Sequence, residues 1–316
     1  MSVIRVGTRS SALAMAQTTT IANRLAASSG AEVEIVPIVT HGDTSTESLS
    51  SLGGTGVFAS ALREALLNGE CDLVVHSLKD LPTDAYTGLV IGATPKRADA
   101  RDALCARNAW TLETLPEGAR VGTGSPRRVA QLKEVRPDLT VVDIRGNIDT
   151  RLGRLVEGDL DAVVLAAAGL GRLGRLDAAC TELLEISAWP TAPGQGALAI
   201  EVREGKLDRV LASALAAINH ATSEAVTTAE RLVLARLEAG CAAPIGATAV
   251  IDGLFFLTAT VYSPDGTRKI TSSHAATPES HSVRDLVDAA RDIAERVATD
   301  LLAGGAAEFA PLKVNK

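Results

Sequence analysis

A lysine and an aspartate that follow a short apolar run are the strongest chemical signal in this sequence. Residues 73–75 predict a strand buried on both faces, which leads through Ser77 into Lys79 and Asp80. In open α/β sheets, ligands bind just outside the carboxyl ends of the strands, so this pair is placed for proton transfer or charge stabilisation. A surface salt bridge in a loop is the alternative interpretation.

Basic residues follow several other predicted strands. The segment 123–128, Thr-Gly-Ser-Pro-Arg-Arg, opens a helix whose free N–H groups favour an anion, and it lacks the Gly-Lys-Ser/Thr ending of a nucleotide-binding loop. Because these turns recur in an acidic chain, we predict a shared polyanion site for a ligand with several carboxylates or phosphates, in preference to scattered solvated charges. Its candidate residues are Arg9, Thr123, Ser125, Arg127, Arg128, Arg145, Gly146, Arg151 and Arg172.

Cys241 lies in a loop between a predicted helix and Pro244, which would present its thiol for covalent attachment or nucleophilic attack. A buried, inert thiol is the alternative. The cysteines are widely scattered and none forms a C-x-x-C pair, so the sequence predicts neither a metal site nor disulfides. They are Cys71, Cys105, Cys180 and Cys241.

The composition excludes several classes of function. A net charge of −7 argues against a general polyanion binder, and 3% aromatic residues leave few stacking platforms for nucleic acid. The longest apolar run, residues 162–170, predicts a strand that Arg172 follows, and it is too short to cross a bilayer. The first residues lack a signal-peptide core. We therefore expect a cytoplasmic protein without nucleic-acid or membrane partners.

Strand and helix patterns alternate along the 316 residues, which predicts an α/β fold with largely parallel sheets. Arg-Val-Gly-Thr occurs at residues 5–8 and again at 120–123, each time followed by a serine and a helix, which suggests two lobes on one plan with a cleft between them. We expect a first α/β lobe over residues 1–97 plus about 197–217, a second over 101–190, and a small α+β domain over 220–316. Two crossings between the lobes would make a hinge.

Together these motifs closely resemble the porphobilinogen deaminase (hydroxymethylbilane synthase) family. The resemblance runs through nearly the whole chain, and several independent motifs in the family's order make it specific. They are the segments 6–13, 75–80, 122–128, 145–147, 193–196 and 240–246.

The resemblance implies two lobes like those of periplasmic binding proteins, plus a C-terminal domain that carries a dipyrromethane cofactor as a thioether on Cys241. Such an enzyme adds four porphobilinogen units head to tail, releases ammonia at each addition, and frees hydroxymethylbilane by hydrolysis. Porphobilinogen and the growing polypyrrole would be its partners, with no obligate protein partner and a monomeric state.

The resemblance also implies roles for individual residues. Asp80 would stabilise positive charge near the pyrrole N–H groups and help to move protons. Lys79 would contact carboxylates of the substrate. The remaining cofactor- and substrate-binding residues would be Arg9, Ser11, Ser77, Thr123, Ser125, Arg127, Arg128, Arg145, Gly146, Arg151, Arg172 and Gln195.

The loop of residues 51–56 departs from the family, because Ser51 and Thr55 stand where the family often has lysines. Its glycines, Gly53, Gly54 and Gly56, suggest a mobile lid, and Phe58 is expected to pack on the cofactor.

Three alternatives remain weaker. A solute-binding protein would be expected to carry a secretory signal, which the first residues lack, and would leave Cys241 without a function. The effector half of a transcription regulator predicts a preceding helix-turn-helix. A nucleotide enzyme built on residues 121–124 has an incomplete phosphate motif.

Overall fold

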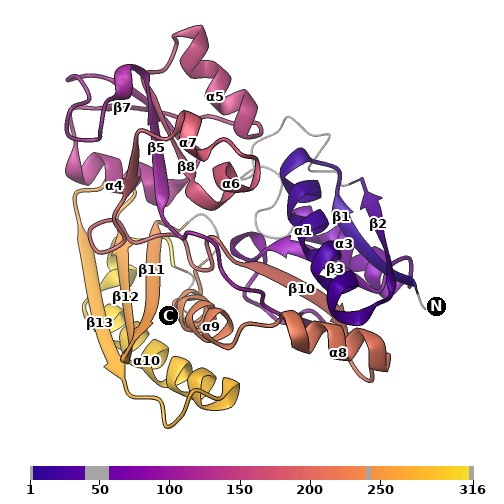
Figure 1. The fold of residues 1–316 in the computed structure, drawn as a ribbon. Coiled ribbons are helices and arrows are strands. Elements are labelled where there is room, and N and C mark those ends of the chain that lie inside the picture. The colour runs from indigo at the N-terminus through magenta and orange to yellow at the C-terminus, as the bar shows by residue number, and fades with distance from the viewer. Residues whose placement is uncertain (1–2, 40–56, 240–242, 313–316) are drawn as a thin grey trace.

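Three β-sheets organise the protein (Figure 1). The computed structural model describes residues 3–39, 57–239 and 243–312, and for Val57 and Phe58 it describes the backbone alone. Two five-stranded sheets form two lobes, and a three-stranded sheet with its helices lies beside both of them. The predicted fold class, two α/β lobes and a small C-terminal α+β unit, is confirmed.

The first sheet has a parallel core with an antiparallel addition. Strand β1 pairs in parallel with β2 and β3, and β10 pairs antiparallel with β3 and β4. Its strands, in spatial order, are β2 (Glu32–Ile38), β1 (Val3–Arg9), β3 (Leu73–Ser77), β10 (Leu198–Arg203) and β4 (Leu89–Ala93). Helices α1 (Ala12–Ser29), α3 (Val57–Leu67) and α8 (Arg209–Ile218) belong to this lobe.

The second sheet follows the same plan. Strand β6 pairs in parallel with β7 and β8, and β5 pairs antiparallel with β8 and β9. The strands, in spatial order, are β7 (Thr140–Val142), β6 (Arg120–Gly122), β8 (Ala162–Ala166), β5 (Asp102–Ala106) and β9 (Glu182–Leu184). The helices are α4 (Pro126–Val135), α5 (Ile148–Glu157), α6 (Ala167–Arg172) and α7 (Leu176–Ala179).

The chain passes between the two lobes at their antiparallel strands. The chain leaves the first sheet after β4 to enter β5, and it returns from β9 into β10. Two adjacent crossings of this kind suit a hinge. The exact domain limits proposed from the sequence stay predictions.

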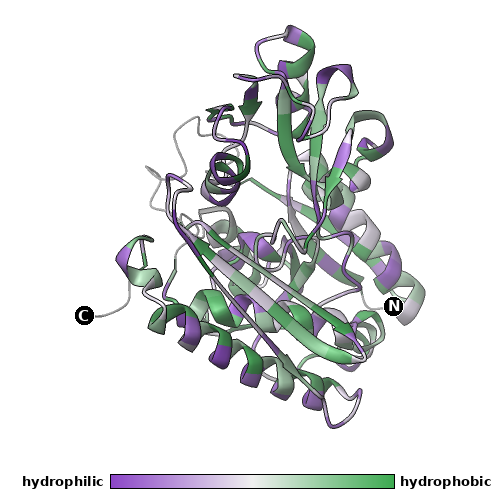
Figure 2. Ribbon diagram, turned by 90° about the vertical axis from the view of Figure 1, so that its left-hand side faces the viewer, coloured by the Kyte–Doolittle hydropathy of each residue, from purple (hydrophilic) through white to green (hydrophobic). Residues whose placement is uncertain are grey.

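The third sheet is an antiparallel meander of β11 (Ile245–Asp252), β12 (Leu254–Tyr262) and β13 (Lys269–Ala276). Helices α9 (Ala221–Arg236) and α10 (Val283–Ala303) pack on it. In α10 the buried residues Leu286, Ala290, Ile293, Val297 and Leu301 recur at helical spacing, so one face joins the core and the other is hydrophilic (Figure 2).

One predicted strand is wrong in part. The apolar run 162–170 continues beyond β8, but the chain turns at Ala166 and forms helix α6. A short apolar run cannot be assigned by periodicity alone, and alanine, which dominates its second half, has the highest helix propensity. Arg172 therefore ends a helix instead of following a strand. No helix in the described ranges is both long and apolar enough to span a membrane.

Candidate functional site

The turn after β3 carries Lys79 and Asp80 in a short 3-10 helix, η1 (Leu78–Asp80). Leu78 is buried and its backbone N–H donates to the carbonyl of Ala197 (3.0 Å), which ties the turn to the segment before β10. Ser77 pairs with the buried amide of Gln17 on α1 (Nε2 to Oγ, 3.1 Å). The turn leaves Lys79 partly buried and Asp80 exposed.

The surroundings of Lys79 make its ammonium unusually easy to deprotonate. The pKa of Lys79 is lowered to about 8, mainly by desolvation and also by the positive charges of Arg128 and Arg127, while the negative charges of Asp80 and Asp102 oppose the shift. Its Nζ lies 3.4 Å from Oε1 of Gln195. These electrostatic interactions place Lys79 of the first lobe beside the arginines of the second.

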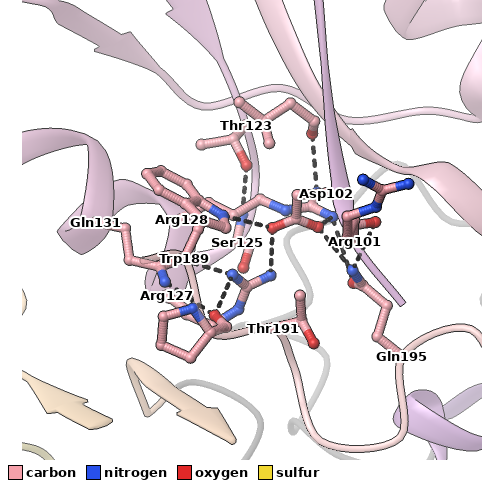
Figure 3. A network of polar contacts seen from close by, with 12 residues as sticks. Arg101, Asp102, Thr123, Ser125, Arg127, Arg128, Gln131, Trp189, Thr191 and Gln195 are labelled. Atoms are coloured by element: carbon pink, nitrogen blue, oxygen red, sulfur yellow. Dashed lines mark hydrogen bonds and ion pairs between the residues drawn. The ribbon is translucent and has the colours of Figure 1, made fainter. Parts of the chain in front are cut away.

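Asp102, the first residue of β5, is the centre of a buried polar network (Figure 3). Its carboxylate accepts from Arg127 Nη2 (2.9 Å), Arg128 Nη2 (2.7 Å), Trp189 Nε1 (2.9 Å) and Gln195 Nε2 (2.8 Å). Although burial alone would raise the pKa of Asp102, the two guanidinium charges and the donated hydrogen bonds hold it far below its usual range. Asp102 is therefore a fixed anion.

Arg127 and Arg128 occupy the first turn of α4, as the sequence predicts. Pro126 starts the helix, and Gly124 allows a close approach, since a Cβ there would lie 2.7 Å from the carbonyl oxygen of Ile144. Arg127 also donates to Gln131 Oε1 (2.6 Å), and Arg128 to the carbonyl of Val164 (2.8 Å). The Nε of each arginine is buried without a hydrogen-bond partner in the part of the chain that the structure describes.

Gln195 joins the two lobes at this network. Its Nε2 donates to the carbonyl of Ala100 (2.7 Å) as well as to Asp102, and its Oε1 faces Lys79 and Arg128. The next residue's carbonyl, that of Gly196, accepts from Arg172 Nη2 (2.7 Å). Burial lowers the pKa of Arg172 to about 10.

The turn after β7 and the first turns of α5 add two further cations. Arg145 is exposed and lies 3.7 Å from Asp143, and Arg151 Nε donates to the carbonyl of Gly146 (2.8 Å). The pKa of Arg151 is lowered by burial, by Arg128 and by Arg145. The positive charges of Arg128 and Arg145 therefore both act on Arg151.

Comparison with known proteins decides the family. Residues 4–210 match the model described as "Porphobilinogen deaminase, dipyromethane cofactor binding domain", and residues 225–303 match "Porphobilinogen deaminase, C-terminal domain". The chain belongs to the porphobilinogen deaminase family. The enzyme of this name from Leifsonia xyli subsp. xyli is 67% identical over 98% of this chain and 95% of that protein. The one from Cutibacterium acnes is 51% identical over 100% of this chain and 99% of that protein.

Solved structures share a more distant likeness. The methionine-binding protein MetQ aligns with a TM-score of 0.45 and 15% identity, over 68% of this chain and 89% of that chain. A periplasmic substrate-binding protein of an ABC transporter from Coxiella burnetii aligns with a TM-score of 0.44 and 16% identity, over 68% and 91%.

The structure brings most of the predicted site residues of this family member together. Lys79, Arg127, Arg128 and Gln195 share one network, which Arg151 and Arg172 adjoin. Thr123 is buried and its Oγ1 accepts from the N–H of Ser125 (3.3 Å).

Other predicted residues lie on elements beside η1 or outside the described residues. Arg9 ends β1, which pairs directly with β3, and Ser11 caps α1 by accepting from the N–H of Ala14 (3.3 Å). Phe58 belongs to α3 but its side chain is not described. The lid glycines Gly53, Gly54 and Gly56, and the predicted attachment residue Cys241, lie outside the described ranges.

Sequence reasoning missed Asp102. The signal was an aspartate at the head of an apolar strand, since a charge at the start of a buried strand requires partners. It also missed the buried pair of Arg97 and Glu230, whose atoms Nη1 and Oε1 lie 2.7 Å apart.

The described residues fit the anionic cofactor of the family. A dipyrromethane made from two substrate units carries several carboxylates. The site offers Lys79, Arg127, Arg128, Arg151 and Arg172 against the single buried carboxylate of Asp102, so positive charge is in excess. The unpartnered Nε atoms of Arg127 and Arg128 are also donors available to an anion.

Replacing Arg128 with Ala should impair cofactor loading or chain extension far more than it impairs folding. The change removes one guanidinium from the anion site while Arg127, Trp189 and Gln195 still donate to Asp102. Intact mass of the purified variant and its elongation products would measure the effect. The exposed Arg120→Ala is a matched control, and an unchanged elongation pattern for Arg128→Ala would make this arginine peripheral.

Proposed function

We propose that this chain condenses four porphobilinogen molecules head to tail, with loss of ammonia, on a dipyrromethane held by Cys241, and releases hydroxymethylbilane by hydrolysis. The observation that carries the proposal is the cationic site between the lobes, in which one buried aspartate is outnumbered by lysine and arginine side chains. Each added unit brings an acetate and a propionate, so the ligand's negative charge grows as the chain extends.

The arginines divide between two tasks in this proposal. Arg127 and Arg128 are fixed by Asp102, so their donors are preorganised and lose little entropy on binding a carboxylate. Arg145 on the turn after β7 and Arg151 on α5 would, with Arg9, Ser11 and Ser77, bind carboxylates further from Asp102. Arg172 and Gln195 would line the hinge side, because Arg172 contacts the segment that returns to β10, and Gln195 belongs to that segment and contacts the outgoing link at Ala100.

Asp80 and Lys79 would carry the proton chemistry. When bound, the cofactor supplies the pyrrole carbon to which the first substrate is joined. Asp80 would stabilise positive charge that develops on a pyrrole ring and accept or return its proton, for which its exposure at the end of β3 gives access. With a pKa of about 8, Lys79 is still mainly cationic near neutral pH and would bind a substrate carboxylate.

Location and assembly complete the proposal. We expect a monomer in the cytoplasm that needs no obligate protein partner and binds neither membranes nor nucleic acid. The net charge of −7 supports the last point, because a general nucleic-acid surface requires a basic excess.

The decisive experiment is an intact mass measurement of the purified protein beside Cys241→Ser. We expect an adduct equal to two linked pyrrole units on the parent protein and a bare mass for the variant, since the thioether needs the thiolate. Cys180→Ser is a matched control, a partly buried cysteine of the second lobe that should keep the adduct. If the parent protein stays bare even after incubation with porphobilinogen, the proposed polymerising function is rejected in favour of a binding role.

A further inference from the structure

The turn that carries Lys79 and Asp80 is contacted by the C-terminal domain through Arg231 on α9. Arg231 Nη1 donates to the carbonyls of Leu78 (3.1 Å) and Leu81 (2.9 Å), and its Nη2 donates to the carbonyl of Pro82 (2.7 Å). One guanidinium thus spans both ends of the turn, although it is some 150 residues away in sequence.

The geometry of this contact suits arginine in particular. The carbonyls at the end of a helical turn lack intrahelical donors, and the planar guanidinium presents several N–H groups at fixed angles. Within the turn the Leu81 N–H donates to the Leu78 carbonyl (3.2 Å), which also accepts from Arg231. Arg231 therefore adds a second restraint on the carbonyl that closes the turn.

Helix α9 is itself firmly seated by the residue before Arg231. The fully buried Glu230 accepts from both Nη atoms of Arg97 (2.7 and 3.0 Å), from the N–H of Gly194 (2.8 Å) and from the N–H of Ala249 (2.9 Å). These partners belong to the two interlobe links and to β11. Glu230 thus fixes the position of α9, and Arg231 links that helix to the turn by hydrogen bonds.

One side of the turn faces an open pocket. This pocket, of about 300 Å³, lies between β4 and α9, and Leu78, Thr83 and Arg231 are among the residues that line it. Because there is open space on this side, the side chains of the turn are not held by close packing alone. The directional bonds from Arg231 supply a restraint that the packing does not.

We propose that Arg231 is a positioning residue for the reaction, which acts through the turn of residues 78–82 to hold the Asp80 carboxylate in place against the substrate. This inference rests on the proposed function of Asp80. It assigns the C-terminal domain a part in the geometry of proton transfer, separate from any part in holding the cofactor.

The test begins with Arg231→Ala and Arg231→Lys. Misplacement of a reacting group by about 1 Å can cost on the order of 10²-fold in rate, so we expect kcat of Arg231→Ala to fall by roughly that factor, with KM and cofactor mass unchanged. Arg231→Lys should recover only part of the loss, since one ammonium lacks the fixed fork. Hydrogen exchange should become faster in the peptide that spans residues 78–82.

The matched control is Arg236→Ala. Arg236 lies on the same helix and makes an exposed ion pair with Glu295 (2.7 Å), so its loss should leave both the rate and the exchange of residues 78–82 unchanged. Unchanged exchange and rate in Arg231→Ala, or an equal effect of Arg236→Ala, would overturn the positioning role.

A double-mutant cycle separates positioning from general destabilisation. If Arg231 acts only through Asp80, Arg231→Ala should not slow an Asp80→Asn enzyme further, whereas an independent structural role predicts additive losses. Additivity rejects the positioning role and leaves the proposed function intact. Near-normal turnover of Asp80→Asn alone would instead reject the proposed role of Asp80, and with it this inference.

Discussion

Asp80→Asn is expected to lower the turnover rate by about 10²–10⁴-fold, the range usual for loss of a general acid or base. Asparagine has the shape of aspartate but neither its charge nor its proton affinity, so charge on a pyrrole ring would lose its counterion. Because Asp80 is exposed, the free energy of unfolding should change by no more than about 0.5 kcal/mol. Porphobilinogen consumption and thermal unfolding, measured on cofactor-loaded protein, would check both parts.

A matched control lies in the same loop. Asp84 is also exposed, four residues further along, and Asp84→Asn should leave turnover unchanged. Near-normal rates for Asp80→Asn would remove Asp80 from the mechanism. Equal losses in the two variants would indicate that the loop responds to any lost negative charge, which would also contradict a specific role.

The second large effect concerns stability. Asp102→Asn should lower the free energy of unfolding by about 3–5 kcal/mol, because removal of one member of a buried ionic group leaves the guanidiniums of Arg127 and Arg128 uncompensated. The amide would also turn an N–H₂ group toward one of these donors. Denaturant unfolding would measure the loss, with Asp288→Asn as control, since its ion pairs with Arg284 and Arg291 are exposed and each contributes at most about 1 kcal/mol.

The same comparison should depend on pH. The pKa of Asp102 is depressed in the folded protein, so its stabilising contribution is complete above the ordinary aspartate value of about 3.9 and declines as pH falls below it. The stability gap between the parent protein and Asp102→Asn should therefore narrow below about pH 4. A constant gap between pH 7 and pH 3, measured under conditions where both unfold reversibly, would mean that the charge of Asp102 is not the cause.

Local patterns predicted most of the elements and the turns that carry the site. The apolar run before Lys79 forms β3, Pro126 begins α4, and the spacing of buried residues in α10 follows the helical period. These features depend on residues within one or two turns of each other, so they can be inferred without knowledge of the remote chain. The run 162–170 is predicted as one strand, but its second half forms helix α6. Composition does not separate the two, because a buried strand and a buried helix are equally apolar.

The sequence also indicated that basic turns would converge, but not how they would be arranged. It suggested that Arg127 and Arg128 face a ligand, whereas the structure shows that both donate to Asp102. The Nε atom of each arginine is buried without a hydrogen-bond partner among the described residues. The partners that decide this, Trp189 and Gln195, lie about 90 residues from Asp102 along the chain. The spacing of residues along the sequence does not predict such a contact.

What the sequence determined by itself is most of the strands and helices, the α/β class and the presence of Lys79, Asp80 and the arginines at strand and helix ends. Propensity, periodicity and capping depend on residues that are close together in the sequence, so they can be inferred from short segments. Only the tertiary structure decided which charges neutralise one another, which remain for a ligand, and that Arg231 reaches the turn of Asp80. These outcomes depend on contacts between distant segments, where burial removes water and forces each charged group to find a partner.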